Sequence, residues 1–243
     1  MALDGAAEQQ NARRRSDGEQ TMSGDTWTHR LARPFVRPLI GTGVTPNHIT
    51  TARLVTGLAA AAALLPGTPA WTWWAGWLWL FSAFLDRADG ELARLGDMAS
   101  PEGRAWDCLV DNIVNPAFFV AIGVGLRHSW LGGWSIPLGL VSGVSLFLCG
   151  YWSELLESRQ NYAVKAYSGA FGFDPDDLLY LFAPLAWLGW LAPILVGAAI
   201  GATIVAILTG WRLMRLGTEE TTEALSETPP TPATADPSRS TSP

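Results

Sequence analysis

Six apolar stretches, separated by short polar turns, constrain this chain more than any other feature of its sequence. Several are close to the roughly 20 residues that an α-helix needs to cross a bilayer, although the fifth is short. A segment in lipid must satisfy its own backbone hydrogen bonds, so the pattern predicts an all-α integral membrane protein with six transmembrane helices. The predicted spans are 48–65, 70–92, 105–126, 133–155, 176–191 and 193–212.

The basic residues predict how these spans are oriented. If the amino terminus is cytoplasmic, Arg127 lies on the outer side, and the other basic residues of the loops and span ends lie inside. Those inner residues are the N-terminal arginines, Arg87, Arg94, Arg104, Arg159, Lys165, Arg212 and Arg215. We therefore expect a multi-pass protein of the cell (inner or plasma) membrane with both termini on the cytoplasmic side. Tryptophans at the outer end of the second span should form an interfacial belt: Trp71, Trp73, Trp74, Trp77 and Trp79.

Polar segments flank the apolar region. Residues 1–25 are rich in Glu, Gln, Arg, Ser and Gly, residues 217–243 are rich in Thr, Ser, Pro and Glu, and we predict that both are disordered tails. Residues 26–44 mix arginine with apolar side chains, which favours an amphipathic segment on the bilayer surface that Pro34 and Pro38 break or kink. Residues 45–216 form the predicted membrane domain. The net charge of −6 is a poor guide to partners, because much of the acid lies in the tails and the motif, and the sequence suggests no basic surface for nucleic acid.

Acidic residues are concentrated at the cytoplasmic ends of the second and third spans. Asp86 and Asp89 share one helix face, and Asp107 and Asp111 share another, because each pair is three or four residues apart. An antiparallel pair of these two helices would bring all four carboxylates to similar depth. Acids at membrane depth normally face a protein cavity, so this placement indicates a functional site.

Four ionised carboxylates in one place repel one another, by about 4 kcal/mol for a unit pair at 4 Å. Some must be protonated, or cations must lie among them. Oxygen ligands favour hard divalent ions such as Mg²⁺, Mn²⁺ or Ca²⁺. The simpler alternative is a solvated helical hairpin whose acids coincide in register.

The acids belong to a longer pattern, D-x2-D-G-x2-A-R-x8-G-x3-D-x3-D, which runs without a gap from Asp86 to Asp111. This pattern resembles the signature of the CDP-alcohol phosphotransferases (CDP-alcohol phosphatidyltransferases), class I. The resemblance implies a phospholipid-synthesis enzyme that moves a substituted phosphate group from a CDP-linked donor to an alcohol and releases CMP. It also implies two divalent cations, Mg²⁺ or Mn²⁺, and a homodimer. The implied metal ligands are Asp86, Asp89, Asp107 and Asp111, with Asp111 as general base.

Further residues of the pattern are expected near the nucleotide. The resemblance implies this for Gly90, Arg94 and Ser100, and Ala93 and Gly103 fit because small side chains allow close approach of a ligand. Helix packing would explain each small residue equally well. Arg94 could bind a phosphate or neutralise the acids.

The residues at the start of the first span can be explained in two ways. Asn47 and Thr50 follow Pro46, in an entry that in the family implies contact with the nucleotide. Capping of the helix would explain the residues without any ligand.

The substrates are less defined. We expect CDP-diacylglycerol as the donor, with a soluble CDP-alcohol and a lipid acceptor as the alternative. Family members that use a phosphorylated polyol usually carry a basic residue after the last motif Asp, and here that residue is Asn112. Arg104, Arg159 and Lys165 are candidates for binding an acceptor phosphate. A divalent-cation transporter using the same acids is an alternative from another class.

Overall fold

The computed structural model describes residues 27–159 and 175–227, and within these ranges the regular structure is entirely helical. Lys165, residues 1–25 and the end of the carboxyl tail lie outside the described residues. The helices and 3-10 turns are α2 (Trp27–Val36), η1 (Arg37–Leu39), α3 (Pro46–Leu64), α4 (Pro69–Leu95), α5 (Pro101–Gly125), η2 (Leu126–His128), η3 (Gly132–Trp134), α6 (Ser135–Arg159), η4 (Pro175–Leu181), α7 (Phe182–Trp187) and α8 (Leu191–Glu227).

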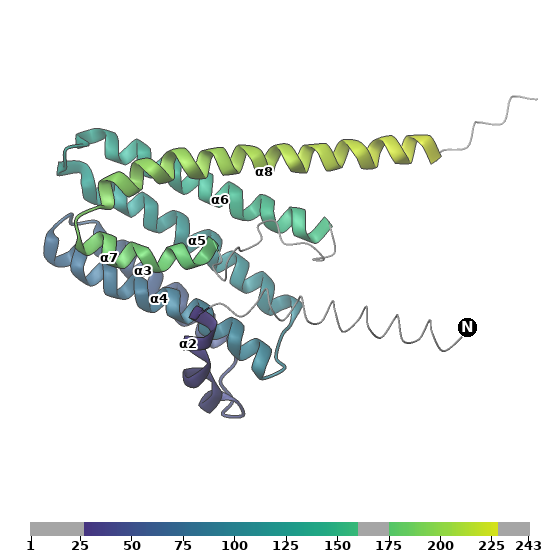
Figure 1. The fold of residues 1–243 in the computed structure, drawn as a ribbon, viewed down its shortest axis with the longest axis horizontal. Helices are drawn as coiled ribbons and strands as arrows, with labels where there is room; N and C mark the ends of the chain where they lie inside the picture. The colour runs from purple at the N-terminus through teal and green to yellow at the C-terminus, as the bar shows by residue number, and fades with distance from the viewer. Residues whose placement is uncertain (1–26, 160–174, 228–243) are drawn as a thin grey trace, which may run out of the picture.

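The long helices run side by side as a bundle, with the shorter α2 set across one end (Figure 1). Extensive contacts join α3 to α4, α3 to α5, α5 to α6 and α6 to α8. The pair α4 and α5, which the sequence predicted to pack directly, is not among them. Instead the backbone of α3 packs closely against both of the helices that carry the acidic motif.

Gly57 allows α3 to lie this close to its neighbours. A Cβ atom at this position would come 2.4 Å from Val114 of α5 and 2.9 Å from Ser82 of α4. These distances are shorter than real carbon contacts, so a larger residue would push the helices apart. The absence of a side chain at Gly57 thus allows the close spacing of the three helices, one turn along α3 from Arg53.

An aromatic cluster fills the centre of the bundle. The ring of Trp79 stacks on that of Phe118 at a centroid distance of 3.7 Å, and Phe119 and Phe182 pack edge-on around them. Trp79 is buried and its indole nitrogen donates a 2.8 Å hydrogen bond to the carbonyl of Leu179. It belongs to the core and not to the interfacial belt predicted for it; the other four tryptophans of that group are exposed, as a belt requires.

Three helical segments of the described chain are long and apolar enough to cross a membrane: Pro101–His128, Gly132–Arg159 and Leu191–Leu216. The apolar stretches 48–65 and 70–92 correspond to α3 and α4. The fifth stretch, 176–191, is not one helix, because it divides into η4 and the six-residue α7.

The boundaries of α8 also differ from the prediction. The turn before it contains Gly189 at φ 76°, a left-handed conformation that glycine adopts readily. Pro193 lies inside the first turn of α8, where a missing amide proton costs nothing. At its other end α8 continues to Glu227, so the helix extends into the range 217–243 for which a disordered tail is predicted.

The amphipathic segment predicted for residues 26–44 contains α2 and η1. Thr28, Ala32 and Val36 are buried, at helical spacing, while Leu31 and Phe35 are exposed. Pro34 does not end the helix, which continues for two more residues. Helix α2 packs against α4 beside the acidic motif.

Candidate active site

Three of the four motif acids converge. Oxygen atoms of Asp86, Asp107 and Asp111 all lie within 4.8 Å of one another, and the three side chains are partly buried. Asp86 comes from α4 and the other two from successive turns of α5. The spacing in the sequence therefore predicted the right neighbours, although α3 and not direct packing brings them together.

Arg53 of α3 lies among these carboxylates. It is 2% exposed, and its Nη1 atom is 2.8 Å from Asp86 and 3.1 Å from Asp107. Its Nη2 atom donates to Asp111, which also accepts a 3.2 Å hydrogen bond from Asn115. A single guanidinium therefore pairs with three acids, which offsets part of their mutual repulsion.

Asp89 contacts different groups. Its Oδ2 atom accepts a 2.7 Å hydrogen bond from the hydroxyl of Thr50, and both side chains are buried. Asp89 is thus held against the first turns of α3, beside the other acids and not within the group of three.

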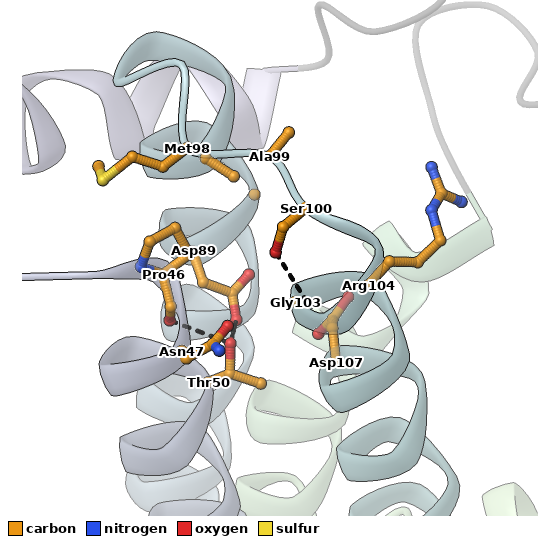
Figure 2. Close-up of a pocket in the computed structure, with 12 residues that line it drawn as sticks. Pro46, Asn47, Thr50, Asp89, Met98, Ala99, Ser100, Gly103, Arg104 and Asp107 are labelled. Carbon is orange, nitrogen blue, oxygen red and sulfur yellow. Dashed lines mark hydrogen bonds between the residues drawn. The ribbon is translucent and has the colours of Figure 1, made fainter.

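A cavity of about 230 Å³ opens beside the acids (Figure 2). Asp89 and Asp107 line it from opposite sides, and Figure 2 shows Thr50 and Asn47 of α3 next to Asp89. Pro46 of α3 also lines it, and the other lining residues come from the end of α4, the loop after it and the start of α5: Gly90, Ala93, Met98, Ala99, Ser100, Gly103 and Arg104.

Local geometry explains why the small residues occur here. A Cβ atom at Gly90 would meet nothing within 4 Å, so no helix packs against this position and the absent side chain leaves cavity space. Gly103 donates its amide to the hydroxyl of Ser100 at 3.0 Å, which caps α5. A Cβ atom at Gly103 would also lie 3.3 Å from the Asn47 side chain. These contacts favour a ligand pocket over helix packing as the reason for Gly90.

The start of α3 is stabilised without Asn47. The backbone amide of Thr45 donates to Nδ1 of His48 at 3.2 Å, which satisfies the entry to the helix. The side chain of Asn47 lines the cavity instead.

Comparison with known proteins agrees with this arrangement. The sequence profile described as CDP-alcohol phosphatidyltransferase matches residues 43–211, which is most of the chain. The chain belongs to the CDP-alcohol phosphatidyltransferase family. It is therefore a transferase of a family that works in phospholipid synthesis.

Solved structures show the same fold. The phosphatidylinositol phosphate synthase PgsA1 of Mycobacterium tuberculosis, solved with CDP-DAG bound, superposes with a TM-score of 0.53 at 18% identity, covering 76% of this chain and 91% of that one. The same enzyme in complex with manganese and citrate gives 0.52 at 17% identity, covering 76% and 86%. No curated protein sequence matches the chain.

The donor set suits the metal that this phosphatidyltransferase family implies. Three carboxylates converge from two helices, and all their donor atoms are oxygens, which a hard divalent cation prefers. The cluster could therefore hold such an ion, with Asp89 adjacent.

Arg94 does not line the cavity. Its guanidinium donates to Glu91, a fully buried carboxylate that also lies 3.1 Å from His29 and 3.6 Å from Arg33 of α2. Glu91 thus joins the end of α4 to α2. The sequence pattern leaves the position of Glu91 unspecified, although a glutamate on the apolar side of a helix indicates a buried partner.

The acceptor candidates are dispersed. Arg104 lines the rim of the cavity, and Figure 2 shows its side chain running away from Asp89 and Thr50. Arg159 is exposed at the end of α6. Asn112 donates to the carbonyl of Cys108 at 3.0 Å and packs on Gly150 of α6, where a Cβ atom would come 2.3 Å from its side-chain oxygen.

Arg53 is the site residue that the sequence reading missed. The signal was present, because an arginine inside an apolar run is costly unless it is paired with an acid. The motif acids are the partners within reach, so a search for opposite charges at similar depth would have connected them.

Proposed function

We propose that this protein transfers a phosphatidyl group from CDP-diacylglycerol to the hydroxyl of an acceptor alcohol and releases CMP. The observation that carries the proposal is the convergence of Asp86, Asp107 and Asp111 beside a cavity that Asp89 and Gly90 also line. Support for the donor comes from the likeness in fold to PgsA1, which was solved with CDP-DAG bound. Other CDP-linked donors with a phospho-alcohol group fit the same site.

The proposed cofactors are two divalent cations, Mg²⁺ or Mn²⁺, held by Asp86, Asp89, Asp107 and Asp111. When bound, such cations neutralise the donor pyrophosphate and stabilise charge on the phosphoryl oxygens as CMP leaves. PgsA1 was crystallised with manganese, which supports this choice.

The chain's own residues position the donor. Asn47, Thr50 and Ser100 supply polar groups to the cavity, and Gly90, Ala93 and Gly103 leave room for the nucleotide. Arg94 lies on the same helix end and is held by Glu91, so its proposed role is at the edge of the nucleotide.

Asp111 is the proposed general base. Arg53 and Asn115 both donate to its Oδ1 atom, which leaves Oδ2 for the acceptor hydroxyl. The proposed base therefore acts through the position of this oxygen.

Arg104, Arg159 and Lys165 are proposed as the residues that could bind an acceptor phosphate, and Lys165 lies outside the described residues. Asn112, where polyol-phosphate enzymes usually carry a basic residue, makes its contacts within α5 and with α6. This arrangement favours an acceptor that does not need a cation at that position.

The proposed setting is the cell membrane. The six helical segments, with η4 and α7 as the fifth, would place the acids, the cavity and both termini on the cytoplasmic side, where water-soluble CMP can leave. A homodimer is proposed from the family.

Membranes containing the full-length protein, labelled CDP-diacylglycerol, Mn²⁺ and a panel of alcohols test the proposal through CMP release. We expect release that requires both metal and an alcohol, and we expect Asp111→Asn to lower it by at least about a hundredfold because the proton acceptor is lost. The matched control is Asp97→Asn, an exposed acid outside the cluster. The proposal would be contradicted if no CDP-linked donor gave metal-dependent CMP release, or if Asp111→Asn kept full activity.

A further inference from the structure

We propose that Arg53 is a positioning residue, an internal counter-ion that holds the acidic cluster together and competes with divalent cations for it. The inference rests on the proposed function only in treating the three converged acids as cation ligands. Its tests measure folding and metal binding and do not depend on turnover.

The position of Arg53 is fixed by its backbone as well as by its charge. The hydroxyl of Ser82 on α4 donates to the carbonyl oxygen of Arg53 at 3.1 Å, and Gly57 lies one turn away where α3 closes on both neighbours. The side chain is 2% exposed, so little water reaches it to weaken its ion pairs. It therefore projects from a rigid helix into the space between α4 and α5.

The guanidinium uses its two terminal nitrogens to join acids of different helices. Nη1 reaches Asp86 of α4 and Asp107 of α5, and Nη2 reaches Asp111 of α5. Further along the bundle α4 and α5 touch through Trp79 and Phe118, and at the acidic motif these ion pairs link the two helices. Without Arg53 and without metal, three carboxylates would face one another with no cation between them.

A divalent cation would bind the same three carboxylates, each of which already pairs with Arg53. The Oδ1 atoms of Asp86, Asp107 and Asp111 are the atoms that Arg53 contacts, and a cation binds such oxygens at about 2.0–2.6 Å. The guanidinium, at 2.8 and 3.1 Å from two of them, is a like charge at close range. Metal binding must therefore displace some of these ion pairs, and the resident charge must weaken metal affinity.

The experiment compares wild type, Arg53→Gln and Arg127→Gln as purified full-length proteins in detergent. Thermal unfolding is followed in EDTA and in Mn²⁺, and Mn²⁺ affinity is measured by titration of the free-ion electron spin resonance signal. Arg127→Gln is the matched control. It removes the same charge, together with hydrogen bonds to the carbonyls of Leu65 and Val124, at the opposite end of α5.

For Arg53→Gln we expect a lower unfolding temperature in EDTA, a larger stabilisation by Mn²⁺ than in wild type, and at least a fivefold lower dissociation constant for Mn²⁺. Arg127→Gln should change stability equally in both buffers. Equal or weaker Mn²⁺ affinity of Arg53→Gln, with wild type binding the ion, would overturn the inference while leaving the proposed function intact. Failure of wild type itself to bind Mn²⁺ would overturn both.

Arg53→Lys covers the case in which Arg53→Gln does not fold. Lysine keeps the charge but lacks the planar fork that spans three carboxylates. Its stabilisation by Mn²⁺ should exceed that of wild type, and an equal or smaller stabilisation would overturn the inference.

Discussion

Asp89 differs from the other three motif acids in what holds it. A buried hydroxyl, that of Thr50, donates to Asp89, whereas Asp86, Asp107 and Asp111 pair with Arg53. The motif spacing identified the acids because helix periodicity puts each pair on one face. It could not assign their partners, since Thr50 and Arg53 come from another helix whose register depends on tertiary packing.

Thr50→Val tests the role of that hydroxyl. Valine keeps the shape of the side chain but removes the donor, and a hydrogen bond to a charged group contributes about 1.5–3 kcal/mol. We expect turnover with a CDP-linked donor to fall about tenfold or more in the CMP-release assay, and Thr50→Ser to restore most of it.

Thr51→Val is the control for this change. Thr51 is the next residue of α3, and its hydroxyl donates only to the carbonyl of Asn47, at 2.7 Å on the exposed face. Wild-type turnover in Thr50→Val, or an equal loss in Thr51→Val, would show that the contact with Asp89 is unimportant.

At the scale of elements, the site depends on α3 as a wedge between α4 and α5. The apolar stretches predicted α3, α4, α5, α6 and α8, because long runs of apolar residues leave few alternatives to a helix. They did not predict which helices touch. The fifth stretch was misjudged because Pro184 and Gly189 interrupt it, and such residues favour short turns over one long helix.

Gly57→Val tests the close packing of α3 against α4 and α5. Its side chain would enter the space that Val114 and Ser82 occupy, and such overpacking typically costs about 1–3 kcal/mol. We expect a lower midpoint of thermal unfolding and reduced CMP release, because α4 and α5 would separate.

Gly201→Val is the matched control for the packing of α3. Gly201 lies on the apolar helix α8, and a Cβ atom there would meet nothing within 4 Å. Its unfolding midpoint should stay at the wild-type value. Equal midpoints for Gly57→Val and wild type would contradict the close packing of α3.

At the scale of the whole molecule, the acids and the cavity lie at one end of the bundle, and the exposed tryptophans after Pro69 lie near the start of α4 at the other. This polarity is what a membrane enzyme needs if its soluble product leaves on one side. The positive-inside pattern predicts that this side faces the cytoplasm.

Cysteine labelling in sealed cells tests the orientation. In a background with Cys108 and Cys149 replaced by alanine, Glu102→Cys and His128→Cys place single exposed thiols at opposite ends of the segment Pro101–His128. We expect a membrane-impermeant thiol reagent to label His128→Cys in intact cells and Glu102→Cys only after lysis. The reverse pattern would invert the proposed topology, and labelling of both in intact cells would exclude a membrane crossing between them.

The central claim is that α4 and α5 present one shared set of carboxylates to divalent cations, and equilibrium Mn²⁺ binding to the purified full-length protein tests it most directly. We expect saturable Mn²⁺ binding by wild type and by Asp97→Asn. Binding should be lost when one acid of each helix, Asp86 and Asp107, is changed to asparagine in the same protein. Undiminished binding by that double variant, or none by wild type, would contradict the claim.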